Sequence, residues 1–316
     1  MTQKQRYKII VIVGPTASGK SELGVRIAHK FNGEIISADS RQVYRGLDAG
    51  SGKVRGGWQK INKSKYFIYK SVLHHCIDIA DPKKIFTAAD FVACGRRAIV
   101  DILTRGKTPI IVGGTGFYID ALLGRVRLAS VPPNPALRKK LRNYSTARLF
   151  NYVTKLNPQH AKAIDSKNPR RLIRAIEIAR ARTALGKTPG VFGISTSGVE
   201  ENAVRALWLG IRHSPENLKK RIRKRLTARL PGIIREVKKL RNPKAGKDVS
   251  WKRFYDLGLE YRYVSLYVHG KIPYKQMAAK LQTASWHYAR RQMTWWKKNK
   301  KIHWFNAPEK ILKYLS

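Results

Sequence analysis

Acidic residues are scarce in this chain. Only 19 of its 316 residues are Asp or Glu, whereas 65 are Lys or Arg, and the formal net charge is +46. So large an excess indicates a polyanionic partner, of which nucleic acid is the commonest. A lineage that favours Lys and Arg everywhere would also raise the charge. Because the excess runs along the whole sequence, we expect both causes to contribute.

Cysteine and long apolar runs are also scarce. Cys76 and Cys94 are the only cysteines, with neither a metal-type spacing nor a disulfide framework, so we expect a reducing, cytoplasmic location. The N-terminal apolar run, Ile9–Val13, is too short for a signal peptide or a membrane span, and we expect no membrane partner. A chain of this length forms one large core, or one core with an inserted lobe.

The strongest motif is a glycine-rich loop of the form G-x-x-x-x-G-K-[ST], which binds phosphate groups. It consists of Gly14, Pro15, Thr16, Ala17, Ser18, Gly19, Lys20 and Ser21. The β-branched run 9–13 before the loop predicts a buried parallel strand, and the apolar residues after it share one helix face. This order directs backbone N–H groups at an anion, while Lys20 adds charge and the Ser21 hydroxyl suits Mg²⁺.

Asp39 follows a second short strand, predicted over 34–37, at the end where open α/β sheets place ligand-binding groups. Two interpretations of this residue stay open. It is either the N-cap of a helix over 41–44, or a carboxylate that faces the phosphate loop and accepts a proton or holds a metal's water. A further buried strand, 109–112, leads into a second glycine-rich turn, 113–116, which we expect to approach the same crevice.

His74, His75 and Cys76 invite a zinc interpretation. Adjacent side chains on a strand point to opposite faces, however, and no second ligand pair follows, so we favour structural histidines. A capping box at Thr87–Asp90 then opens the next predicted helix.

Three prolines in 131–135 mark a boundary, because proline cannot continue a helix or a central strand. From there to about residue 185 the pattern is helical and basic. In it Arg170, Arg171 and Arg174 form a cationic strip opposite apolar residues. The segment 186–198 reads as the return linker. We predict a catalytic core over 1–130 and 192–316 and an inserted helical lobe over 131–191.

The remaining sequence returns to the core pattern. An apolar strand is predicted over 203–211, and Ser214 with Pro215 starts a helix. The segment 212–241 holds twelve Lys or Arg against two Glu. The C-terminal stretch mixes basic residues with Trp286, Tyr288, Trp295, Trp296 and Trp304. Such aromatic residues can stack on bases, but we favour core or interface positions for most of them.

Several of these motifs, taken in series, resemble the tRNA dimethylallyltransferases, also called tRNA isopentenyltransferases. The resemblance covers nearly the whole chain, in the family's order. The segments that carry it are GPTASGKS, EIISADSRQVYRGLD, HHCIDI, TAADF, PIIVGGTGFYIDALL, NPRRLIRAIEIARARTALGKTP, LGIRHSPENLKKRIRKRL and ARRQMTWWKKNKKIHWF. The chain departs from the family at 51–54, where SGKV replaces a Thr-Ala-Lys-Pro type run, and at 255–260, where YDLGLE replaces a Gly-Tyr form.

The resemblance implies a fold and a reaction. The fold would be a P-loop NTPase-like parallel sheet flanked by helices, with an inserted all-helical lobe that closes over the anticodon stem-loop. The enzyme would transfer a dimethylallyl group from dimethylallyl diphosphate to the exocyclic amine of adenine-37, 3′ of the anticodon in tRNA. It would use Mg²⁺ and act as a monomer.

The resemblance also implies roles for single residues. Asp39 would accept the amine's proton, Thr115 would hold the amine or the carboxylate, and Arg221 would match the family arginine that reaches the diphosphate. The implied tRNA contacts are Asp39, Ser40, Arg41, Gln42, Thr115, Arg138, Arg170, Arg171, Leu172, Ile173 and Arg174.

Two other functions compete with this one. A nucleotide kinase or ATPase would use the same loop, but it requires an apolar strand that ends in a metal-binding Asp, and 109–112 ends in Gly-Gly-Thr. An RNA-binding module with a degenerate phosphate loop is disfavoured by the intact Gly19-Lys20-Ser21.

Overall fold

The structure, a computed structural model, describes residues 9–61, 64–184, 205–243 and 248–316. The chain groups into two compact units, one formed by 1–126 with 199–316 and the other by 127–198. The first boundary lies just before the prolines that mark it in the sequence. The predicted return linker, 186–198, lies outside the described residues. None of the described helices is long and apolar enough to cross a membrane.

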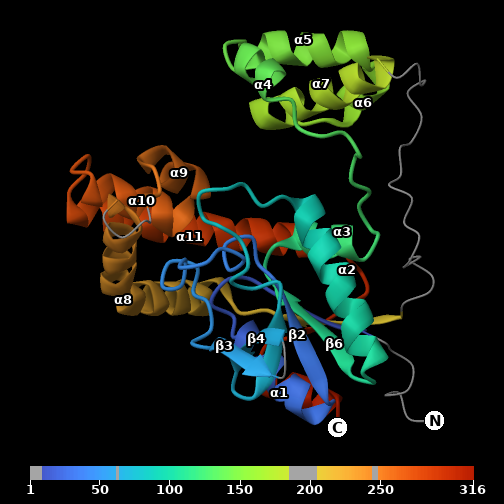
Figure 1. The fold of residues 1–316 in the computed structure, drawn as a ribbon, viewed down its shortest axis with the longest axis vertical. Coiled ribbons are helices and arrows are strands. Elements are labelled where there is room, and N and C mark those ends of the chain that lie inside the picture. Colours follow the sequence, from blue (N-terminus) through green and yellow to red (C-terminus); the bar gives the residue numbers. More distant parts are fainter. Residues whose placement is uncertain (1–8, 62–63, 185–204, 244–247) are drawn as a thin grey trace. The chain divides into compact units, whose positions relative to one another are not determined.

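The larger unit is built on one eight-stranded sheet (Figure 1), with the strand order β3-β4-β5-β2-β6-β1-β7-β8. The strands are β1 Ile9–Val13, β2 Gly33–Ala38, β3 Gly57–Ile61, β4 Ser64–Tyr69, β5 Val72–His75, β6 Thr108–Gly113, β7 Ala206–Ile211 and β8 Ile302–Phe305. The six neighbouring strands β5, β2, β6, β1, β7 and β8 are parallel to one another. Strands β3 and β4 are antiparallel and form one edge of the sheet. The fold is thus the predicted α/β sheet with flanking helices.

The helices of this unit are α1 Lys20–Lys30, α2 Ala88–Thr104, α3 Gly116–Leu122, α8 Pro215–Leu240, α9 Trp251–Leu257, α10 Leu259–Val268, α11 Tyr274–Trp296 and α12 Pro308–Tyr314. Helix α1 packs on the central strands, and α12 packs on α1. Helices α2 and α3 also contact the sheet. A second hydrophobic core lies between helices α8, α9, α10 and α11 and the segment that follows β2. It includes Val43, Leu47 and Tyr261.

Most predicted elements of the core are confirmed. The strands at 9–13, 34–37, 109–112 and 203–211 and the helix after the phosphate loop are present within a few residues. The capping box at Thr87 and Asp90 has both of its hydrogen bonds. Strand β3 was not predicted, because all five of its residues are exposed and give no alternating pattern.

The smaller unit is a helical lobe of α4 Pro135–Leu141, α5 Thr146–Leu156, α6 Pro158–Ala163 and α7 Pro169–Ala184. Its own core contains Leu141, Leu149, Val153, Leu172 and Ile176, all nearly or fully buried. Because the apolar residues of all four helices meet in one cluster, the lobe has a core of its own.

Cys76 and Cys94 form a disulfide, which the sequence gave no reason to expect. Cys76 follows β5 and Cys94 lies on α2, and their Cα atoms are 6.1 Å apart. Helix α2 packs against β5 and brings the two residues together. That contact is tertiary, so a separation of 18 residues did not reveal it.

Glu34 is a buried carboxylate on β2 and gathers three cationic or titratable partners. Arg105 donates to both of its oxygens, Lys107 donates at 2.9 Å, and His75 lies 2.7 Å away. Burial alone would raise the pKa of Glu34, but the hydrogen bonds from Arg105, His75 and Lys107 outweigh it and hold this pKa well below its usual range. His75 is therefore a structural histidine, as favoured above. Asp101 is close enough for a three-residue metal site, yet Arg105 and Lys107 already neutralise Glu34.

We predict that Glu34→Gln lowers the free energy of unfolding by about 3 kcal/mol, the cost of breaking a buried ion pair whose partners keep some exposure. The lowered pKa means that this stabilisation is fully present at neutral pH, begins to decline as the pH falls below about 4.5, and is lost only as the pH approaches the folded-state pKa. Urea denaturation at pH 7 and at a series of pH values below 4 measures both effects. Glu22→Gln, which removes the exposed pair with Lys70, is the control and should change stability by less than about 1 kcal/mol. Equal effects of the two variants would contradict the prediction.

Candidate functional site

The phosphate loop connects β1 to α1, as the motif predicts. Lys20 folds back over it and donates to the Pro15 carbonyl at 2.6 Å and to the Ser18 hydroxyl at 3.4 Å. Gly14 and Gly19 both have positive φ, and a Cβ at Gly14 would lie 2.6 Å from the Ile211 carbonyl oxygen. Only glycine fits that position, because β7 runs directly alongside the loop.

A cleft of about 650 Å³ opens beside this loop at the carboxyl ends of the parallel strands. Among the predicted site residues, those that line it are Thr16, Lys20, Ser21, Asp39 and Gln42. Lining residues that were not predicted as site residues include Ser37, Ser51, His74, Arg225, Tyr288 and Gln292. The cleft therefore brings the phosphate loop and the segment after β2 to one place, where open α/β sheets bind ligands.

Asp39 lines the cleft and caps a turn, and the predicted helix over 41–44 is absent. No helix follows it among the described residues of 40–47, but its Oδ1 accepts from the backbone N–H groups of Arg41 and Gln42 at 2.8 and 3.3 Å. The carboxylate thus caps a turn and still lines the cleft. Thr115, from the second glycine-rich turn, accepts from the Ser40 N–H at 3.1 Å and so fixes the same segment.

Two basic side chains, Lys20 and Arg225, line the cleft close enough to interact. Burial and the nearby Arg225 lower the pKa of Lys20 to about 7, although Asp39 opposes the shift. Burial and Arg229 lower the pKa of Arg225 to about 10. Like charges brought together without an anion between them repel each other. A ligand that carries several negative charges would relieve this repulsion, so the cleft is suited to a diphosphate.

Arg221 and Arg225 lie one helical turn apart on α8 but occupy different places. Arg221 is exposed, and its Nε donates to the Ala17 carbonyl at 2.8 Å, on the outside of the phosphate loop. Arg225 lines the cleft and donates to the Thr16 hydroxyl at 3.1 Å. The sequence analysis selected Arg221 for the diphosphate, whereas the structure places Arg225 in the cleft.

Gln292 on α11 joins the two glycine-rich turns. Its Oε1 accepts from the Thr16 N–H at 2.8 Å, and its Nε2 donates to the Gly114 carbonyl at 2.9 Å. Tyr288, one turn earlier, lines the cleft and hydrogen-bonds Thr115, and burial raises the pKa of its phenol. The RQMTWW segment carried a signal for Gln292, but nothing in it said which side chain faces the cleft. Trp296 is fully buried, as favoured for most of these aromatic residues.

The predicted tRNA contacts of the lobe differ in their exposure. Arg170 and Arg171 lie on the exposed face of α7, whereas Arg138 and Arg174 both pair with the buried Glu177. The Leu172 side chain is fully buried in the lobe core, so a tRNA contact at Leu172 would have to be made by its backbone. Its apolar character placed it on the strip opposite the arginines, and that strip is the core face of the helix. Ile173 packs at the edge of the same core.

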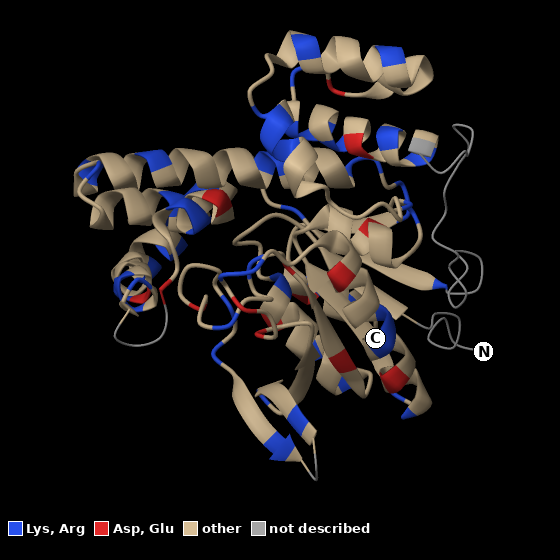
Figure 2. Ribbon diagram, turned by 45° about the horizontal axis from the view of Figure 1, so that its top comes forward, with Lys and Arg blue, Asp and Glu red and all other residues tan. Residues whose placement is uncertain are grey.

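Lys and Arg are spread along the ribbon of both units (Figure 2), and Asp and Glu are few in each. Within the smaller unit, Arg170 and Arg171 give α7 an exposed basic face. Such a surface is typical of proteins that contact a nucleic-acid backbone.

We predict that dimethylallyl diphosphate binding takes up protons at pH 8, where Lys20 is largely neutral in the free protein, and much less at pH 6, where it is already charged. The bound diphosphate should raise the pKa of Lys20, because an opposite charge favours the ammonium form. Titration calorimetry in buffers of different ionisation enthalpy measures the uptake. Lys20→Gln is the matched control, and the same uptake in both proteins would contradict the assignment.

Comparison with known proteins agrees with this geometry. A sequence model of the IPP transferase family matches residues 42–299. The tRNA dimethylallyltransferase 1 of Syntrophus aciditrophicus is 39% identical over 294 residues, which cover 92% of this chain and 89% of that protein. The enzyme of the same name from Hahella chejuensis is 36% identical over 305 residues, with 95% and 92% covered.

A solved structure is similar over the same extent. The tRNA delta(2)-isopentenylpyrophosphate transferase of Staphylococcus epidermidis superposes with a TM-score of 0.63 at 33% identity, and the match covers 97% of this chain and 96% of that one. The sequence motifs, the sheet with its phosphate loop, and these matches all lead to the same family. The chain belongs to the IPP transferases, the tRNA dimethylallyltransferases.

Proposed function

We propose that this enzyme transfers a dimethylallyl group from dimethylallyl diphosphate to the exocyclic amine of adenine-37 in tRNA, giving N6-(dimethylallyl)adenosine. One observation carries the proposal. A single cleft holds the phosphate loop, Lys20 and Arg225 together with the Asp39 carboxylate. Such a cleft has cations for a leaving diphosphate and a base for an attacking amine.

The cations act on the leaving group. As the bond between the prenyl carbon and the diphosphate oxygen breaks, negative charge grows on the diphosphate, and preorganised positive groups lower the barrier most. The groups that would stabilise this charge are the backbone N–H groups of the phosphate loop, Lys20 and Arg225. Arg221 remains a candidate for the outer face of the loop, through its contact with Ala17.

Asp39 would accept the proton that the adenine amine loses as its nitrogen bonds the prenyl carbon. A carboxylate within hydrogen-bond reach of the nucleophile is the usual geometry for a general base. The two backbone donors of Arg41 and Gln42 hold the carboxylate in place, and Thr115 and Tyr288 support the same corner of the cleft.

Mg²⁺ is the proposed cofactor. The Ser21 hydroxyl and the Asp39 carboxylate both line the cleft, and hard oxygen donors of these types are the ligands that Mg²⁺ prefers. When bound, the ion would neutralise part of the diphosphate charge. Lys20 and Arg225 would still be needed to orient the leaving group.

One base of the tRNA substrate would enter this cleft. An adenine inside a stacked anticodon loop cannot expose its amine to the prenyl carbon, so the base has to leave the stack. Asp39, Ser40, Arg41, Gln42 and Thr115 would contact it, and Arg138, Arg170, Arg171, Ile173 and Arg174 of the lobe would contact the anticodon stem-loop. We propose that the enzyme acts as a monomer in the cytoplasm, where tRNA is modified.

The direct test incubates the purified protein and tRNA with labelled dimethylallyl diphosphate or with γ-labelled ATP. We expect the prenyl label on the RNA and no transfer of the phosphate label. Transfer of phosphate instead would favour the kinase alternative.

We predict that Asp39→Asn slows single-turnover prenyl transfer by at least about a hundredfold, because an amide cannot accept the proton. Asn still caps a turn, so thermal stability, tRNA binding and dimethylallyl diphosphate binding should stay near those of the unchanged protein. Rapid-quench kinetics with bound substrates isolate the step. A near-normal rate would mean that Asp39 only caps the turn. A loss of tRNA binding would mean that Asp39 contacts the adenine of the tRNA.

We also predict that Arg225→Ala slows the same step by about a hundredfold or more, the typical cost of removing one group that stabilises developing charge. Arg221→Ala is the matched comparison, since it removes the same side chain one turn away. It should slow transfer far less, because its contact lies outside the cleft. The reverse ranking would return the diphosphate role to Arg221.

A further inference from the structure

The loop formed by residues 47–53 is a wall of the cleft. Ser51 lines the cleft directly. The Gly52 carbonyl accepts long hydrogen bonds, both of 3.4 Å, from the Gln42 amide and from the Arg225 guanidinium. The position of this loop therefore sets where two cleft side chains lie, and one of them is the proposed leaving-group cation.

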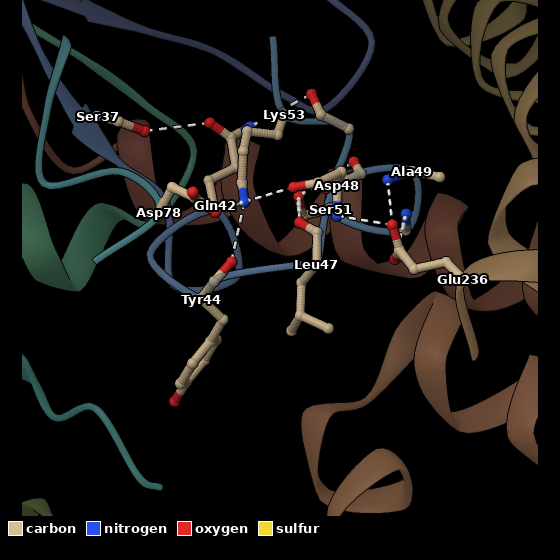
Figure 3. Close-up of polar contacts among 12 residues, drawn as sticks. Ser37, Gln42, Tyr44, Leu47, Asp48, Ala49, Ser51, Lys53, Asp78 and Glu236 are labelled. Carbon is tan, nitrogen blue, oxygen red and sulfur yellow. Dashed lines mark hydrogen bonds and ion pairs between the residues drawn. The ribbon is translucent and has the colours of Figure 1, made fainter. Parts of the chain in front are cut away.

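A single carboxylate on α8 holds the backbone of this loop. Glu236 Oε2 accepts from the Asp48 and Ala49 N–H groups at 2.7 and 2.6 Å, and Oε1 accepts from the Gly50 N–H at 3.1 Å. Figure 3 shows the carboxylate pointing at this turn from the neighbouring helix. Oε1 also accepts from the buried Tyr261 hydroxyl at 2.7 Å, so the carboxylate is itself anchored. Charge-assisted hydrogen bonds of this kind are the strong ones.

The same face of α8 also hydrogen-bonds the backbone carbonyls of the loop 47–53. Arg229 donates through Nε to the Ala49 carbonyl at 2.8 Å and through Nη2 to the Gly50 carbonyl at 2.7 Å. Arg225, Arg229 and Glu236 are spaced by four and seven residues, which places them on one side of α8. Helix α8 thus carries both the cation, Arg225, and the groups that hold the loop, with Pro231 between Arg229 and Glu236.

The loop is closed from its other side by a buried lysine. The Lys53 side chain is 2% exposed, and its Nζ donates to the Tyr44 carbonyl and to the Asp48 and Asp78 carboxylates. These contacts are visible beside Glu236 in Figure 3. Because the loop is held at both ends, a change at Glu236 should move residues 49–52 and leave the Lys53 end in place.

Glycine at position 52 completes the arrangement. Gly52 has a φ of +64°, and a Cβ there would lie 2.1 Å from Arg225 Nη2. At this position the family pattern described above has the Ala of its Thr-Ala-Lys-Pro type run. In this chain the missing methyl group lets the guanidinium rest on the loop.

We infer that Glu236 is a positioning residue for prenyl transfer, which acts on Arg225 through the loop 47–53. The inference rests on the proposed function, since it needs Arg225 to face the leaving diphosphate. Glu236 is not among the residues that line the cleft. It fixes the Gly52 carbonyl, and that carbonyl orients the guanidinium.

The test is a double-mutant cycle of Glu236→Gln and Arg225→Ala, measured by single-turnover prenyl transfer with saturating substrates. We expect Glu236→Gln alone to slow transfer by about tenfold to a hundredfold, since a displacement of about 1 Å at a catalytic group has effects of that size. In the Arg225→Ala background the same substitution should change the rate by less than about twofold, because the group through which it acts is gone. A purely structural role would slow both backgrounds equally and would overturn the inference.

Three further variants define the outcome. Glu216→Gln, on the exposed first turn of α8, is the matched control and should transfer at the normal rate. Tyr261→Phe keeps the carboxylate but removes its anchor and should give a smaller loss of the same kind. Gly52→Ala displaces Arg225 from the opposite side, so its effect should also vanish in the Arg225→Ala background.

Tyr261→Phe keeps the inference testable if Glu236→Gln fails to fold, because it acts through the same carboxylate, and a normal rate for it would overturn the inference. If Arg225→Ala itself transferred at the normal rate, the proposed role of Arg225 would fail first. If Arg225→Ala slowed transfer and the effects of Glu236→Gln and Arg225→Ala on the rate were additive, only the role of Glu236 would be overturned.

Discussion

The site depends on two basic side chains buried in one cleft. Lys20 comes from the first segment of the core and Arg225 from the second, and burial is the largest cause that lowers the pKa of each. An anionic ligand completes the electrostatics of the cleft, and the same interaction that binds a diphosphate stabilises it as it departs. Binding and chemistry thus share one physical cause.

Helix α8 is where this electrostatic arrangement meets the hydrophobic core. Its apolar residues, from Leu226 to Leu240, pack in the second core with α9, α10 and α11. Its polar side presents Arg225 to the cleft and Glu236 to the loop 47–53. The packing of the apolar face of α8 therefore fixes the direction in which its polar side chains point. That coupling explains why a helix rich in charge can still hold a guanidinium at a defined place.

Much of the fold followed from the sequence because its signals are local. The strand before the phosphate loop, the glycines of the loop and the capping box at Thr87 each depend on neighbouring residues. Most of the misses depend on tertiary contacts. The choice between Arg221 and Arg225 turns on which side of α8 faces the loop, and both arginines carry the same residue type. The disulfide and the bridging role of Gln292 likewise arise only once separate segments pack together. Strand β3 pairs with its sequence neighbour β4 and was missed because its exposed residues give no alternating pattern.

The order of the strands has a consequence for synthesis of the protein. Strand β1 is flanked by β6 and β7, and Thr16 of the phosphate loop bonds Gln292, which is 276 residues away. Strand β8 and helix α12, from the last residues of the chain, complete the sheet edge and cover α1. The phosphate loop therefore leaves the ribosome long before Gln292, β8 and α12, and it stays without these partners until they have emerged. Contacts at such separation slow folding, and the nascent loop and its apolar strand remain exposed in the meantime.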